Sequence, residues 1–258
     1  MQKKRPRKPS PPPTRLGAVV LFRANSGEQD LIVTFLTREL GLISALAKNA
    51  RKSVKRFGGG LLSPGRAAYY FFRIRELSDL ALVERGEFNP KAPLPPTQPM
   101  PQALAAFALE LVRAFEAPRN PALLSFNLLL VFLGHLSEIE TEDRPYLKSR
   151  SLTLAFTKLY MELAGFGPDF QGLAYSLEGA VAKAFSESSE PTDPPGDSLE
   201  GSLVMKLKTV KDLRIIPDFT ADELNSAFDF YFALAARSSG KLFKSRKVLN
   251  RYLRDSNE

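Results

Sequence analysis

GAVVLFRANSGEQDLIVTFLTRELGLISALAK, residues 17–48, alternates short apolar runs with residues that favour turns, such as those in ANSGEQD and RELG. Five runs, several of them rich in β-branched or aromatic residues, lie between residues 16 and 90, at 17–23, 31–37, 42–48, 66–74 and 77–87. Strands so closely spaced mostly leave no room for crossover helices. The pattern predicts a small antiparallel barrel, and a five-stranded oligonucleotide-binding (OB) barrel fits the count.

A proline-rich stretch, NPKAPLPPTQPMP at 89–101, ends the strand pattern. Proline has no N–H to donate and fixes φ, so neither a helix nor an interior strand is expected to continue through it. We therefore expect an OB domain at 16–90, a linker at 91–100 and a second domain at 101–258. In the second domain the apolar spacing predicts helices at 101–116, 121–139, 147–165, 173–185, 199–212, 220–237 and 241–254. The predicted fold class is α+β, with an OB barrel followed by a mostly α-helical domain.

Two segments hold too few apolar residues to order themselves by burial. Residues 1–15 are predicted to be a disordered basic tail, and the acidic, proline-rich segment 186–198 an exposed, mobile loop. No apolar stretch follows the basic start, so a secretory signal is not indicated. The most apolar run, 122–133, is shorter than the roughly 20 residues that cross a bilayer, so we expect a buried helix there and no membrane contact.

Composition favours an anionic partner and a reducing compartment. Lysine and arginine number 36 against 28 acidic residues, and the net charge of +8 suits nucleic acid, an anionic membrane or an acidic protein segment. The chain contains no cysteine, which excludes disulfides and thiolate metal sites and makes the cytoplasm the expected location.

The positive charge is concentrated in a few segments. The basic cluster, as we call it, lies between two predicted strands and consists of Lys48, Arg51, Lys52, Lys55 and Arg56. Such a group can hold phosphates through charge-assisted contacts and the release of counterions. Taken singly, each basic segment could equally be a solvated surface. The FGGG that follows the cluster lets this segment follow an irregular backbone, which favours the binding interpretation.

Four consecutive aromatic residues, 69–72, occupy one predicted strand, so alternate members face opposite sides. One pair is expected in the core. The other pair, for which Tyr69 and Phe71 are the candidates, could stack on bases in the manner of single-strand binders or pack beneath the neighbouring domain.

Residues that could carry catalysis are scarce. His135 is the single histidine and follows an apolar run, so no zinc-binding histidine pair exists. FGGGLLSPG lacks the Lys-Ser/Thr of a phosphate-binding loop. The acids at 138–143 are typical of a solvated helix end. We therefore expect no enzyme, no catalytic residue, no metal and no cofactor.

Three segments resemble the bacterial recombination mediator family RecO. In the first, Gly27-Glu28-x-Asp30, Leu36-Thr37-x-Glu39-x-Gly41 and Ala47-Lys48-x-x-Arg51 match the family's N-terminal pattern in order and spacing. The others are AGFGPDF at 164–170 and SGKLFKSRKVLNRYL at 239–253. The resemblance thus covers both predicted domains.

This resemblance implies an N-terminal OB barrel and a helical C-terminal domain. It also implies binding of single- and double-stranded DNA without sequence preference, annealing of complementary strands, and association with the nucleoid. The implied partners are RecR and the acidic C-terminal tail of single-stranded DNA-binding protein, with a functional link to RecA, which loads on DNA during repair.

One departure from the family is visible. Many members carry a four-cysteine zinc module just after the Gly-Phe-x-Pro-Asp motif, and the first pair of ligand positions falls here on Leu173 and Ser176. Neither side chain replaces a thiolate, so the chain is a variant without that zinc site.

The resulting hypothesis is that the basic cluster, aided by Arg38 and Arg73, binds phosphates across one face of the barrel. The rival is a protein-interaction adaptor, whose basic C-terminal helices dock acidic partner segments through Lys241, Lys244, Arg246 and Lys247. An RNA-binding OB protein stays open as a third interpretation, because phosphate contacts do not distinguish the sugar.

Overall fold

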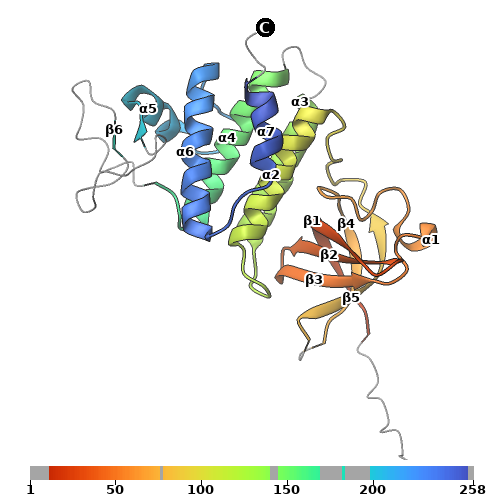
Figure 1. The fold of residues 1–258 in the computed structure, drawn as a ribbon. Helices are drawn as coiled ribbons and strands as arrows, with labels where there is room; N and C mark the ends of the chain where they lie inside the picture. The colour runs from red at the N-terminus through yellow and green to blue at the C-terminus, as the bar shows by residue number, and fades with distance from the viewer. Residues whose placement is uncertain (1–11, 76–77, 140–144, 169–181, 184–197, 255–258) are drawn as a thin grey trace, which may run out of the picture.

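A computed structural model describes residues 12–75, 78–139, 145–168, 182–183 and 198–254 (Figure 1). Five strands close into a barrel in the order β1-β2-β3-β5-β4, and they are β1 (Thr14–Ser26), β2 (Asp30–Thr37), β3 (Gly41–Ala47), β4 (Ala67–Arg73) and β5 (Leu80–Phe88). The predicted five-stranded barrel is confirmed. One pairing differs from the expectation, since β3 and β5 run parallel while the other four pairs are antiparallel.

The barrel interior is filled by alternate residues of its strands, as the two-residue period of a strand requires. The ring of Phe35 lies 4.7 Å from that of Tyr70 and 5.1 Å from that of Phe72, measured between centroids, and all three side chains are fully buried. The Tyr70 hydroxyl donates a hydrogen bond to the carbonyl of Leu61. Burial raises the pKa of Tyr70 well above its ordinary value, so the hydroxyl stays protonated and keeps the β3–β4 connection on the barrel.

Helices follow the barrel in the order α2 (Pro99–Phe115), α3 (Leu123–Ile139), α4 (Pro145–Leu163), α5 (Gly201–Thr209), α6 (Ala221–Ser239) and α7 (Ser245–Arg254). The helical second region is therefore confirmed. Helix α2 begins inside the stretch predicted as a linker, because proline is tolerated in the first turn, where the missing N–H has no intrahelical partner anyway.

Two sequence expectations fail in detail. Ala182–Lys183 pairs as β6 with β7 (Ser198–Leu199), so these residues are neither helical nor loop. Strand β1 begins at Thr14, inside the segment expected to be a disordered tail, because Thr14 and Arg15 pair with β4. Most of the predicted helix 173–185 and loop 186–198, together with Leu173 and Ser176, lies outside the described residues.

The last helix is held by a carboxylate from another element. Glu110, on α2, accepts hydrogen bonds from the backbone N–H groups of Lys244 and Ser245, at 3.0 and 2.9 Å, and from the Ser245 hydroxyl at 2.8 Å. These are donors that the first turn of a helix leaves without an intrahelical partner. Glu110 thus fixes the start of α7 against α2.

The barrel and the helices share a core. Ala18 and Val20 of β1 point into the barrel, whereas Val19 and Leu21 are buried with residues of α2 such as Leu104. The α2–α3 loop also forms isolated bridges from Pro118 to Gly41 and Leu42 at the start of β3. Across the described ranges, no helix is long and apolar enough to span a membrane.

Candidate nucleic-acid interface

The β3–β4 connection carries the basic cluster and is tied to the turn between β1 and β2. The backbone N–H of Asn49 donates to the Asp30 carboxylate at 2.7 Å, and that of Arg51 donates to the carbonyl of Gln29 at 3.1 Å. A single helical turn, α1 (Val54–Phe57), follows and buries Phe57 in the barrel core. Figure 1 shows α1 on the side of the barrel away from the helices.

Both arginines of the basic cluster bond to neutral oxygen atoms. Arg51 donates to the carbonyl of Glu28 at 3.0 Å, and Arg56 donates to the Ser53 hydroxyl at 2.9 Å and to the carbonyl of Lys48 at 2.6 Å. These bonds orient the guanidinium groups but do not neutralise them. Lys48, Lys52 and Lys55 are exposed, and no described carboxylate forms an ion pair with them. Among the described residues, the cluster therefore presents five positive charges that have no carboxylate partner.

Beside the basic cluster lies an open cavity of about 450 Å³, lined by Arg23, Arg51 and the glycines that follow α1, among others. Gly59 has φ +63°, and a Cβ there would come within 2.7 Å of the Phe88 ring. The positive φ favours glycine at this position, where the loop lies close to the Phe88 side chain of β5. Arg23 was not among the residues predicted from the sequence.

Arg38 and Arg73 are not part of the basic cluster. Arg38 follows β2 at the Thr37–Gly41 end of the β2–β3 pair, whereas Lys48 follows β3 at the opposite end. Arg38 instead lines a cleft of about 460 Å³ with Tyr69, Lys91 and residues of α3. Arg73 pairs with Glu84 on the outside of the barrel. The β2–β3 hairpin therefore places Arg38 at the opposite end from Lys48. A contribution of Arg38 or Arg73 to phosphate binding stays a prediction.

The aromatic run divides as its strand period requires. Tyr70 and Phe72 are fully buried, and Tyr69 and Phe71 lie on the outer face, half-buried. Each outer ring is already covered by an arginine. The Cζ atom of Arg15 lies 3.7 Å from the centroid of the Tyr69 ring, and that of Arg85 lies 3.9 Å from the centroid of Phe71. Sequence reasoning missed both arginines, because only the pairing of β4 with β1 and β5 brings them to this face.

The four candidate partner-binding residues surround the start of α7. Lys241, Lys244, Arg246 and Lys247 are all exposed. Arg246 lies 3.2 Å from a carboxylate oxygen of Asp229, and its guanidinium carbon lies 5.4 Å from the Phe232 ring centroid. Leu242, 90% exposed, projects among these cations.

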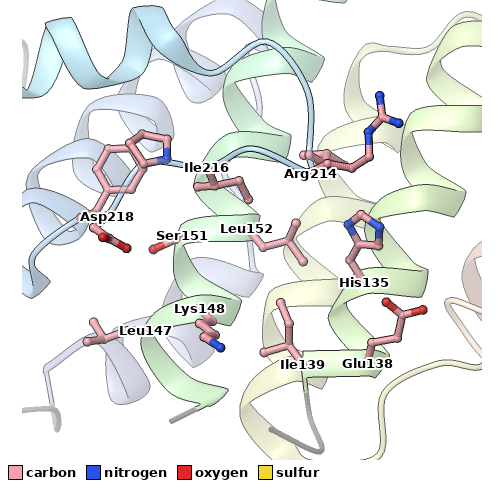
Figure 2. A pocket seen from close by; sticks show the side chains of 13 residues that line it. His135, Glu138, Ile139, Leu147, Lys148, Ser151, Leu152, Arg214, Ile216 and Asp218 are labelled. Atoms are coloured by element: carbon pink, nitrogen blue, oxygen red, sulfur yellow. The ribbon is translucent and has the colours of Figure 1, made fainter. Parts of the chain in front are cut away.

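A larger cavity, of about 680 Å³, lies between α3, α4 and the segment 213–219 (Figure 2). Its lining is apolar at Ile139, Leu152, Ile216 and elsewhere, and it carries charged or titratable groups at His135, Glu138, Lys148, Arg214 and Asp218. His135 thus lies at a cavity and not in the core. Within the described ranges, no three histidine or acidic side chains gather where they could hold a metal ion.

Comparison with known proteins agrees with the barrel and its helical continuation. The family model described as "Recombination protein O N terminal" matches residues 13–89. "DNA repair protein RecO" of Desulfatibacillum aliphaticivorans is 31% identical over 157 residues, which are 61% of this chain and 58% of that protein. The protein of the same name from Geobacter sulfurreducens is 31% identical over 177 residues, 66% of this chain and 70% of that one.

A third relative, "DNA repair protein RecO" of Syntrophotalea carbinolica, is 34% identical over 140 residues, or 54% of each chain. The chain thus spans between about half and 70% of the length of these curated relatives. The chain belongs to the RecO family.

Proposed function

We propose that this protein is a recombination mediator in DNA repair, which binds single- and double-stranded DNA without sequence preference and anneals complementary strands. With RecR it would help RecA to load on DNA covered by single-stranded DNA-binding protein. Family membership supports the biological role. The observation that supports DNA handling is the basic cluster, whose cations project from the barrel without carboxylate partners among the described residues.

The proposed mechanism needs no chemical step. Two complementary strands repel each other through their phosphates, and lysine and arginine side chains lower that repulsion when they replace the condensed counterions. Contacts to the phosphates leave the base edges free to pair. Because such contacts carry no base information, the binding is the same for all sequences.

The test is fluorescence anisotropy of a labelled single-stranded oligonucleotide over a salt series, with the full chain and its Lys52→Glu/Lys55→Glu variant. If about five phosphates are engaged, the slope of log affinity against log salt should be about −3.5, from roughly −0.7 per contact. The variant should bind all sequences more weakly and with a shallower slope.

Lys208→Glu/Lys211→Glu is the matched control. It makes the same change in net charge at the end of α5, which Figure 1 shows on the far side of the helices from the barrel. If the control weakens binding as much as the Lys52→Glu/Lys55→Glu variant does, only the overall charge matters, and the assignment to the basic cluster is wrong.

The cavity of Figure 2 favours an adaptor role as the second candidate. An acidic tail, such as that of single-stranded DNA-binding protein, would meet Lys148 and Arg214 there beside apolar residues, with Glu138 and Asp218 also in the lining. We infer that this cavity, more than the start of α7, takes such a tail. Arg214→Glu should then weaken the binding of a labelled acidic peptide more than Lys241→Glu does, with DNA binding unchanged.

A further inference from the structure

We propose that the outer face of β1, β4 and β5 is a stacking platform for the bases of an unpaired strand, and that the stacking surfaces are the guanidinium groups of Arg15 and Arg85. The inference rests on the proposed function, which it deepens by assigning a second contact surface apart from the basic cluster. The rings of Tyr69 and Phe71 lie beneath these guanidinium groups and support them.

The arginines lie close against their rings. Distances of 3.7 and 3.9 Å from Cζ to the ring centroid are those of two carbon groups in van der Waals contact, and are well inside the ~6 Å limit of cation–π pairs. A planar guanidinium reaches such a distance when it lies along the ring. Each ring thus carries a flat, charged group whose other side is available to a ligand.

One carboxylate holds both arginines. Glu87 lies 3.5 Å from Nε of Arg15 through one oxygen and 2.9 Å from Nη1 of Arg85 through the other. The register explains why, since Tyr69 pairs with Glu87, and Phe71 pairs with both Arg15 and Arg85. The side chains of Arg15 and Arg85 are 50% and 52% exposed, so they are oriented without being covered. Bases stack on guanidinium planes as they do on aromatic rings.

The spacing suits an unpaired strand. Tyr69 and Phe71 are two residues apart on one strand, which separates the two stacks by roughly 6.6 Å. This is about twice the ~3.4 Å rise between stacked bases in a B-form strand. Bases seated on the two arginines are therefore unstacked from each other, an arrangement that a duplex does not offer.

Cations for the phosphates flank the platform at both ends. At one end, Arg73, which is ion-paired with Glu84, lies beyond Phe71 on β4. The strand pairing continues from Arg73 through Leu82 to Leu46, two residues before the exposed Lys48. At the other end, Tyr69 borders the cleft that Arg38 and Lys91 line. A strand bound across the platform would thus meet positive charge before and after the stacked bases.

The experiment compares a thymidine oligonucleotide with an abasic oligonucleotide of the same length, which keeps the phosphates and removes the bases. The chain of 258 residues should bind the thymidine strand about tenfold more tightly. In Arg15→Lys/Arg85→Lys, which keeps both charges but loses both planar groups, that ratio should fall close to one, while affinity for the abasic strand stays within about twofold.

Arg113→Lys/Arg237→Lys is the control, because Arg113 lies 4.1 Å from the ring of Phe22 and so forms the same kind of stack away from the platform. It should keep the wild-type ratio. A ratio unchanged in Arg15→Lys/Arg85→Lys, or equal affinity of the wild type for both strands, overturns the platform and leaves the proposed function standing. Failure of the wild type to bind either strand overturns both.

Discussion

At the scale of single residues, the contact between barrel and helices depends on Gly41. It opens β3 with φ +57°, and a Cβ at this position would lie 2.0 Å from the carbonyl oxygen of Asn120 and 3.0 Å from that of Ala117. Next to Gly41, the N–H of Leu42 donates to the carbonyl of Ala117, and the N–H of Arg119 donates to the carbonyl of Leu42. The barrel and the α2–α3 loop therefore meet backbone to backbone, at a distance that only glycine permits.

Gly41→Ala should accordingly destabilise the protein by about 3 kcal/mol or more, because the methyl group forces the two backbones apart in addition to straining φ. Gly27→Ala is the matched control, since Gly27 has φ +67° but nothing within 4 Å of its Cβ position. It should lose only the ~1–2 kcal/mol of a left-handed alanine. Urea unfolding measures both changes. Equal losses would show that the contact with Asn120 contributes nothing.

The sequence contains Gly41 within a motif, but its physical reason was not predictable. A glycine after a turn indicates positive φ, which is a local property. The carbonyl oxygens that exclude a side chain come from residues 117 and 120, and no local pattern places them there.

At the scale of elements, α6 begins with a complete capping box. Thr220 accepts a hydrogen bond from the N–H of Glu223 at 3.2 Å, and Glu223 accepts one from the N–H of Thr220 at 2.8 Å. The same carboxylate lies 2.8 Å from Nζ of Lys206 on α5. Partial burial acts to raise the pKa of Glu223, but the bonds from Lys206 and Thr220 outweigh it, and the pKa is lowered.

Because the pKa of Glu223 is lower in the folded state, its charge stabilises the protein at a pH above the unfolded-state pKa of about 4.3. This stabilisation is lost as the pH falls through the folded-state pKa. Glu223→Gln keeps the capping geometry and removes the charge. The variant should therefore be less stable at neutral pH, and the difference from wild type should shrink as the solution is acidified below pH ~4.3. Thermal unfolding across this range checks it. A difference that is constant with pH would mean that the charge contributes nothing.

The elements themselves were largely predictable, and the failures have local causes. All five strands and most helices fall within a few residues of the predicted ranges, because apolar spacing and turn residues agree along the chain. Ala182–Lys183 adopts a strand because it pairs with Ser198–Leu199, a distant segment, and such pairing overrides helical spacing. The arginine stacks were missed because each joins residues that only the barrel register brings together.

At the scale of the whole molecule, strand β1 belongs to two cores. Its consecutive residues 18–21 are all buried, alternately inside the barrel and against the helices. The apolar run AVVL indicates a strand buried on both faces, but the element covering the outer face could not be read from the sequence. It proves to be α2, which begins within the proline-rich stretch expected to separate two domains.

This shared core leads to a prediction about cooperativity. A chain of 258 residues with two independent domains would unfold in two steps. Here the core of the helices also contains five residues of the barrel, namely Val19, Leu21, Leu36, Leu42 and Ala67. Arg119 also bonds from the α2–α3 loop to the carbonyls of Arg75 and Ser78, between β4 and β5. If either the barrel or the helices unfold, apolar side chains of the other part become exposed to water, so the unfolding of one part should destabilise the other.

We therefore expect one calorimetric transition, with the calorimetric enthalpy equal to the van't Hoff enthalpy. Gly41→Ala, which weakens the junction without touching either interior, should broaden or divide that transition, whereas Gly27→Ala should only shift it. Two separate transitions in the wild type would contradict the shared core. The barrel would then behave as an independent unit, and the fixed placement of the stacking platform relative to the cleft beside α3 would no longer follow from the fold.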